Sequence, residues 1–86
     1  MRFQAPESLS EQIAQHLAKQ IIHGDMLAGD RIQELRVAGE LDVSRGSVRE
    51  ALLILQRRQL IDILPRRGAV VKEMSEAHVR SLYEVM

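Results

Sequence analysis

The chain has 86 residues, of which 45% are hydrophobic and 2% aromatic, so we expect one small domain with an aliphatic core. No cysteine is present, which excludes disulfides, thiolate metal sites and thiol catalysis. The formal net charge is zero, yet residues 45–72 carry seven Lys or Arg against two Asp or Glu, and a positive field confined to one stretch is typical of nucleic-acid binding.

Residues 1–7 are predicted to form an N-terminal arm, and they lack the apolar segment of a secretory signal. No apolar run elsewhere approaches the roughly 20 residues needed to span a bilayer. From the sequence we therefore expect a soluble, cytoplasmic protein that does not associate with membranes.

A first helix is predicted over residues 8–23. Ser8 and Glu11 have the spacing of a capping box, in which each side chain satisfies a backbone N–H at the helix start. Gly24 follows the helix as a typical C-terminal capping residue. Apolar residues recur every four positions, as expected for a helix that is buried along one side: Leu9, Ile13, Leu17 and Ile21.

Residues 26–32 are predicted to form a connector with a turn, in which Ile32 is a candidate strand residue that returns to the core. A second helix is predicted over 34–41, followed by a short turn. Ser44 then caps a third helix over residues 45–59. Two short helices joined by so short a turn are typical of a helix-turn-helix.

The third helix has a basic side and an apolar side. The apolar side, which is predicted to face the core, is formed by Val48, Leu52 and Leu55. Arg45 and Arg49 share the other side, and we predict that Arg45 contacts a base edge or phosphate in the major groove while Arg49 contacts guanine O6 and N7. The small residues Gly46 and Ser47 would let free backbone N–H groups approach a phosphate. The alternative is a solvated helix face with local ion pairs around Glu50.

After the third helix, the apolar period changes from helical to alternating. Strands are predicted at 61–64 and 69–72, which form a hairpin. Arg66 and Arg67 lie at its tip, where they would reach the DNA backbone or the minor groove, and Gly68 permits a close approach or a positive φ. The alternative for this tip is an ordinary polar turn.

The predicted fold class is therefore α+β and mostly helical. It is a winged helix-turn-helix of three helices and a two-stranded β-hairpin wing, with the start of a further C-terminal helix. That last helix is predicted to begin at Ser75, and it has an apolar stripe of its own.

No catalytic or metal-binding pattern is visible in the sequence. The three histidines, His16, His23 and His78, lack the spacing of metal ligands. No nucleophile–base set and no glycine-rich phosphate loop is present. We therefore expect that the chain is not an enzyme and that this segment holds no metal or cofactor.

Two segments resemble the winged helix of the GntR family of transcription regulators. Residues 32–38 and 43–52 follow the family pattern L-x-E-x-x-L-A-x-x-x-x-V-S-R-x-x-V-R-E-A-L closely, ending in V-S-R-G-S-V-R-E-A-L. Residues 22–32 are similar to the family's connector, and residues 66–71 are similar to its wing. The resemblance extends over residues 8–72, most of the chain.

Residues 75–86 resemble the opening of the helical effector domain in FadR-type members of the family. The resemblance implies a DNA-binding domain over 8–73 and, over 74–86, a linker and the first helix of a mostly absent effector and dimerisation domain. That absent domain would bind a metabolite, often with a metal.

The function implied is sequence-specific binding of double-stranded DNA by a transcription regulator, a metabolite-responsive repressor when full length. It would act as a homodimer on a palindromic operator, with dimerisation through the absent domain. The alternative function is a winged helix that docks a protein partner.

By resemblance, Arg45 and Arg49 match the arginines that contact DNA in the family, Gly68 matches the wing glycine, and Arg67 is a groove contact. The predicted DNA contacts are Ser44, Arg45, Gly46, Ser47, Arg49, Arg36, Arg66, Arg67 and Gly68.

The sequence departs from the family pattern at three places. Gly46-Ser47 replaces a frequent Thr-Pro, and Ala28 replaces the usual connector proline. Leu35 stands where some members use an arginine to reach DNA. Arg36 is the candidate substitute, although it points about 100° away around the helix.

Overall fold

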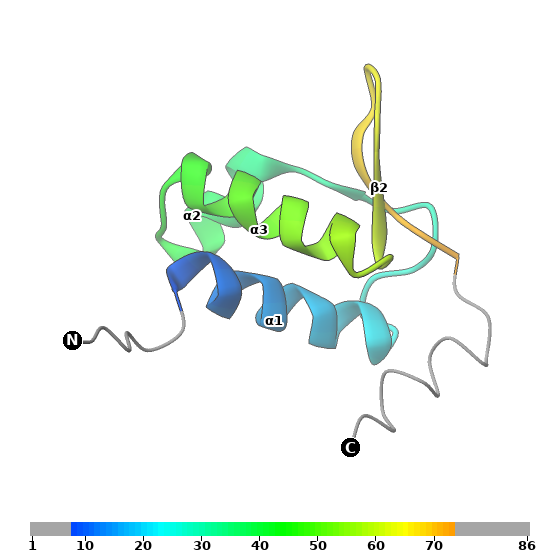
Figure 1. The fold of residues 1–86 in the computed structure, drawn as a ribbon, viewed down its shortest axis with the longest axis horizontal. Helices are drawn as coiled ribbons and strands as arrows, with labels where there is room; N and C mark the ends of the chain where they lie inside the picture. The colour runs from blue at the N-terminus through cyan, green and yellow to red at the C-terminus, as the bar shows by residue number, and fades with distance from the viewer. Residues whose placement is uncertain (1–7, 74–86) are drawn as a thin grey trace.

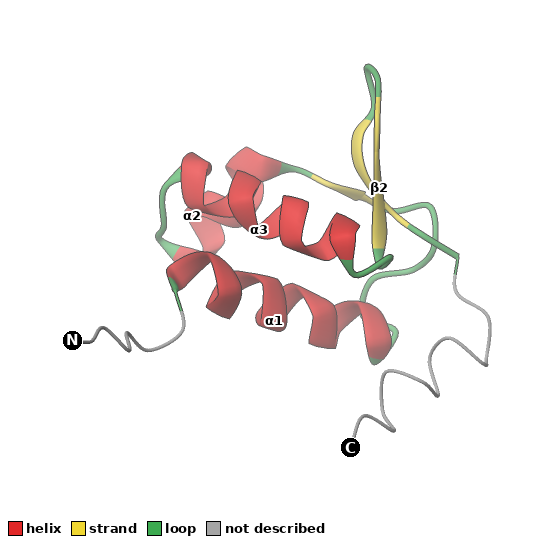
Figure 2. Cartoon of the chain, in the orientation of Figure 1, coloured by secondary structure: helices red, strands yellow, loops and turns green. Residues whose placement is uncertain are grey.

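A computed structural model describes residues 8–73 of the protein (Figure 1). Its elements in chain order are α1 (Leu9–Ile22), β1 (Arg31–Ile32), α2 (Glu34–Leu41), α3 (Arg45–Arg57), β2 (Ile61–Leu64) and β3 (Gly68–Val71). α3 lies between α1 and α2, and the β2–β3 hairpin rises beside α3 (Figure 1). Figure 2 shows the strands gathered at one side of the helices. The predicted winged helix-turn-helix is confirmed, whereas the predicted arm and C-terminal helix lie outside the described residues.

The first helix begins and ends where its capping residues predict. The Ser8 hydroxyl accepts from the Glu11 backbone N–H at 3.1 Å, and the Ser8 N–H donates to the Glu11 carboxylate at 3.4 Å. At the other end, Gly24 adopts a φ of 89°, which costs a glycine little. The predicted range of 8–23 thus includes the two caps, Ser8 and His23.

The turn between α2 and α3 is as short as predicted. Asp42 ends α2 in the left-handed region with a φ of 57°, and the Val43 N–H donates to the Ala38 carbonyl at 3.0 Å. The Ser44 hydroxyl then accepts from the Ser47 N–H at 3.1 Å and starts α3. The helix-turn-helix is therefore closed by backbone and capping hydrogen bonds.

The third helix ends two residues earlier than the predicted residue 59. Gln59 adopts a φ of 67°, its N–H donates to the Gln56 carbonyl, and the Leu60 N–H donates to the Leu55 carbonyl. These two bonds form a Schellman motif, which normally uses glycine at the left-handed position. The prediction was wrong here because a glutamine gives no sign of this conformation.

The hairpin belongs to a three-stranded antiparallel sheet with the order β1-β3-β2. Ile61 pairs with Val71 at the base of the hairpin, and Leu64 pairs with Gly68 near its tip. β1 adds a third strand because Ile32 pairs with Ala69, so the sheet is wider than the predicted two-stranded wing. β3 occupies residues 68–71, one position before the predicted strand.

An aliphatic core fixes the position of α3. α3 contacts α1, α2 and β2, and the residues that point inward from it are Val48, Ala51, Leu52 and Leu55. Burying a large aliphatic side chain contributes about 1.5–3 kcal/mol. The remaining core residues are Ile13, Ala14, Leu17, Ile21, Ile32, Val37, Ala38, Leu60, Ile61, Ala69 and Val71. Because the apolar side of α3 is held in this way, its basic side must face outward.

Candidate nucleic-acid interface

An open groove of about 650 Å³ lies between the start of α2, α3 and the hairpin. Four arginines from three separate segments line it: Arg31, Arg45, Arg49 and Arg67. Its apolar lining is formed by Ile32, Leu35, Leu52, Leu53, Ile63 and Ala69. Glu34 is the one carboxylate among the residues that line this groove. The groove is therefore positively charged and has an apolar floor.

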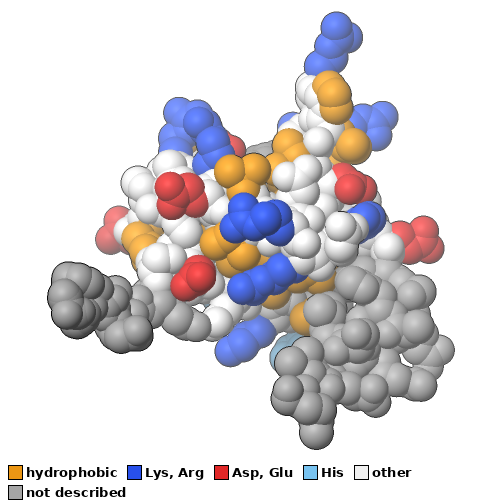
Figure 3. Space-filling view, in the orientation of Figure 1, with side chains coloured by type: hydrophobic (Ala, Val, Ile, Leu, Met, Phe, Trp, Pro, Cys, Tyr) orange, Lys and Arg blue, Asp and Glu red, His pale blue; other side chains and the backbone are white. Residues whose placement is uncertain are grey.

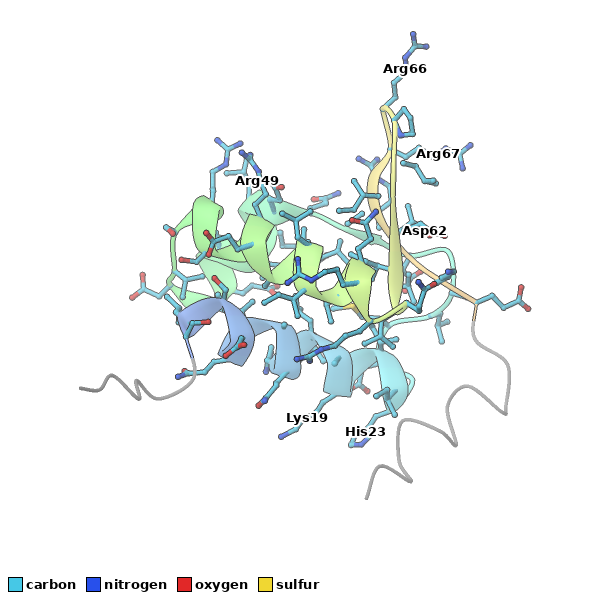
Figure 4. The ribbon with its side chains drawn as sticks, in the orientation of Figure 1. Lys19, His23, Arg49, Asp62, Arg66 and Arg67 are labelled. Carbon is cyan, nitrogen blue, oxygen red and sulfur yellow. The ribbon has the colours of Figure 1, made fainter. Side chains whose placement is uncertain are left out.

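Arg45 and Arg49 of α3 lie on the same side of the molecule as the wing, since they line one groove with Arg67. Figure 4 shows Arg49 and Arg66 pointing upward from α3 and from the wing tip, and Arg67 pointing sideways from the wing, whereas Lys19 of α1 and His23 at its C-terminal cap point to the opposite side. In Figure 3, Lys and Arg side chains gather at the top of the hairpin and across from it at the upper edge of the helices, with hydrophobic side chains between them. The two predicted signals, the α3 arginines and the wing arginines, thus form one face.

Arg49 is held by a carboxylate from the preceding helix. Its Nε donates to one Glu34 oxygen at 3.1 Å and its Nη2 donates to the other at 3.0 Å. This side-on pairing leaves the Nη1 donors and one Nη2 donor for another ligand, and the Arg49 side chain remains 60% exposed. Glu50, considered above as the centre of local ion pairing, instead accepts from the Ser10 hydroxyl at 2.6 Å. Arg49 is therefore paired but still able to read a base edge.

The hydrogen bond from Arg49 holds the pKa of the Glu34 carboxyl below its ordinary value, although partial desolvation acts in the opposite direction. A carboxyl pKa lowered in the folded state stabilises the fold above the ordinary pKa of glutamate. That contribution is lost as the pH falls through the lowered pKa. We expect an NMR titration to find the pKa of the Glu34 carboxyl below that of an ordinary glutamate. The Arg49→Ala substitution should raise this pKa. An unchanged pKa in that variant would show that the ion pair is absent in solution.

At the start of α3, the backbone is less available than the sequence suggested. The Ser47 N–H is bonded to the Ser44 hydroxyl, which also donates to the Ser47 hydroxyl at 2.9 Å. The free N–H groups expected for phosphate binding therefore do not include that of Ser47. A Cβ added at Gly46 would meet only the Ser44 hydroxyl, at 4.0 Å, so nothing in the described part of the chain requires glycine there.

The wing tip is a tight turn with an arginine in an unfavourable conformation. The Arg67 N–H donates to the Leu64 carbonyl at 3.3 Å across Pro65 and Arg66, and Arg66 has a φ of 69°. Proline followed by a left-handed residue is the pattern of a type II turn, whose third position normally holds glycine or asparagine. A left-handed conformation costs a residue with a side chain roughly 1–2 kcal/mol. Gly68 also has a positive φ, 76°, as predicted.

Arg31 was not among the predicted site residues. Its Nε donates to the Arg67 carbonyl at 3.1 Å, which joins β1 to the turn at the wing tip, and it lines the groove. One signal was available in the sequence. Ile32 was expected to turn inward from a strand, and adjacent strand residues point to opposite faces.

Arg36 lies outside this groove. Its Nε donates to the Glu40 carboxylate at 3.1 Å in an exposed pair on α2. It lines a separate hollow together with the carboxylates of Asp25, Asp30 and Glu40. Arg36 therefore does not stand beside Arg49, and its predicted DNA contact stays a prediction.

Within residues 8–73, no group of three or more His, Asp or Glu side chains is arranged to hold a metal ion. No helix in the same range has the length and apolar character needed to cross a membrane.

Comparisons with known proteins agree on one family of transcription regulators. A family model described as bacterial regulatory proteins, gntR family, matches residues 9–71. The HTH-type transcriptional repressor RspR of Escherichia coli K12 is 36% identical over 75 residues, covering 87% of this chain and 33% of that protein. The gluconate operon transcriptional repressor of Bacillus subtilis is 37% identical over 78 residues, covering 91% of this chain and 32% of that protein.

A solved structure has the same arrangement. It is a transcriptional regulator of the GntR family from Pseudomonas syringae pv. tomato, with a TM-score of 0.71 and 33% identity, covering 83% of this chain and 30% of the other. The chain spans about a third of the length of the curated relatives it matches.

Proposed function

Because the chain belongs to the GntR family of bacterial regulatory proteins, we propose that it binds double-stranded DNA sequence-specifically through the groove between α3 and the wing. α3 with its side chains is about 10–12 Å across, which fits a major groove about 12 Å wide. The wing then lies along the adjacent backbone or minor groove. The observation that carries this proposal is the convergence of Arg31, Arg45, Arg49 and Arg67 on one face.

The roles of the individual side chains follow from their placement. Arg49, oriented by Glu34, offers paired donors to a guanine edge, whereas Arg45 at the start of α3 reaches a base edge or phosphate. Arg66 and Arg67 neutralise phosphates near the wing. Ser44 and Ser47 chiefly fix the helix start.

For the full-length protein, we propose a FadR-type regulator that represses transcription in response to a metabolite. It acts in the cytoplasm as a homodimer on a palindromic operator. The two relatives described above are both named repressors, and each is more than twice as long as this chain. The metabolite, and any metal, would bind in the part of such a protein that corresponds to the remaining two thirds.

The proposed function is tested by selecting duplexes from a random-sequence pool and measuring affinity across salt concentrations by fluorescence anisotropy. For each phosphate neutralised, the slope of log K against log salt should steepen by about 0.9. Specific and unrelated duplexes should separate clearly in affinity. A shallow slope with no preferred duplex would instead support the alternative, a winged helix that docks a protein partner.

Arg66→Asn should leave stability unchanged or raise it slightly, while it weakens DNA binding. Asparagine tolerates the left-handed conformation, so the turn loses up to about 1–2 kcal/mol of conformational cost. The loss of one phosphate contact should reduce the salt slope by about 0.9. Thermal unfolding and salt-dependent anisotropy measure the two effects separately.

Lys19→Gln is the matched control for Arg66→Asn, because it removes one positive charge on the side of the molecule opposite the wing. The control should keep the wild-type salt slope. If Arg66→Asn also kept that slope, the wing tip would not contact phosphate.

A further inference from the structure

Leu35 is an exposed leucine within an arginine-lined groove. The residue is 66% exposed, whereas the residues of α2 that enter the core are Val37 and Ala38. It lines the same groove as Arg45 and Arg49. The fold therefore gains little from burying this side chain, and its place in the groove exposes it to whatever the groove binds.

Leu35 is kept close to the base-reading part of α3. It follows Glu34 in the first turn of α2, and Glu34 is joined to Arg49 through two hydrogen bonds of 3.0 and 3.1 Å. A duplex that places a base edge against Arg49 therefore also brings neighbouring base edges toward Leu35.

The chemistry of the major groove leaves one favourable partner for such a side chain. Base edges there present oxygen, nitrogen and amino groups, and thymine alone adds an apolar group, its C5 methyl. A leucine that covered a polar edge would remove water from it and offer no hydrogen bond in return. Against a methyl group, the same side chain buries apolar surface.

We propose that Leu35 is a specificity-determining residue that contacts the C5 methyl group of a thymine beside the base pair read by Arg49. This inference rests on the proposed DNA binding. It adds a preference for one base that Leu35 reads through an apolar contact, without a hydrogen bond of its own.

The test replaces thymine by uracil, one position at a time, in a duplex selected by the 86-residue chain. The exchange removes only the methyl group and keeps base pairing. At one thymine in each half-site, the wild-type protein should lose about fourfold in affinity, the value expected for one buried methyl-sized group. Leu35→Ala should bind the thymine and uracil duplexes equally, and its thermal unfolding midpoint should not fall.

Leu27→Ala is the matched control, because Leu27 is a similarly exposed leucine, at 63%, and is not among the groove residues. It should keep the fourfold uracil effect. The proposal is overturned if no uracil exchange weakens the wild type, if the selected half-site contains no thymine, or if Leu35→Ala keeps the full effect. When duplexes are still bound with a steep salt slope, these outcomes overturn the role of Leu35 alone. Loss of all duplex binding overturns the proposed function as well.

Discussion

Replacing Arg49 with alanine is expected to weaken binding to the selected site by about 1–3 kcal/mol, roughly 5-fold to 150-fold in affinity, and to remove the base preference at one position. The guanidinium offers two parallel donors to guanine O6 and N7, and an alanine offers none. Binding to unrelated duplexes should fall much less, because phosphate contacts carry most of that affinity. The measurement is a repeat of the duplex selection with the variant, followed by anisotropy on single-base variants of the site.

The Arg49→Ala variant also leaves Glu34 without its partner at the DNA-facing groove. An unpaired carboxylate there repels phosphates, so part of the loss belongs to Glu34 and not to the lost guanine contact. The double variant Arg49→Ala/Glu34→Gln removes this repulsion. It should recover some affinity for all duplexes, but not the base preference.

Two further variants define what Arg49 does. Arg49→Lys keeps the charge but not the paired donors, so it should bind DNA with little preference at that position. Lys19→Ala removes a positive charge on the opposite side of the molecule and should change neither affinity nor preference. Unchanged base preference in Arg49→Ala would contradict the assignment of Arg49 as a base-reading residue.

The sequence was sufficient to predict most of the fold because its local signals agree with its packing. The Ser8–Glu11 capping box and the Ser44 cap mark helix starts that the structure confirms. The predicted apolar stripe of α1 is buried at Ile13, Leu17 and Ile21, but Leu9 in the first turn is exposed. The end of α3 was missed because the left-handed residue is Gln59, where glycine would have been the usual signal. Conformation there follows from the burial of Leu60, which no local pattern reveals.

The site was predictable only in part, because the residues that form it are distant from one another in the sequence. Arg45 and Arg49 were identified from their spacing along one helix, and the structure places both in the groove. Arg31 lines the same groove because β1 pairs with β3, and these two strands are separated by about half of the chain. The Glu34–Arg49 pair likewise joins two helices, so helical periodicity did not indicate it.

Joining two copies of the chain should raise affinity for a palindromic site by about 10²–10⁴-fold over that of a single copy. The second binding event then occurs within one molecule, at a high effective concentration, with no new contact. Half-sites one helical turn apart are about 34–36 Å from centre to centre, a span that a Gly/Ser linker of about 40 residues matches on average. Anisotropy on duplexes with one or two half-sites gives the ratio of affinities.

The helical phase of the two half-sites provides the control for the tandem protein. Adding about 5 base pairs between them turns the second half-site to the opposite face of the duplex, and most of the gain should be lost. Arg49→Ala in one of the two copies should reduce the gain without abolishing binding. Equal affinities for one and two half-sites at every spacing would contradict the palindromic operator.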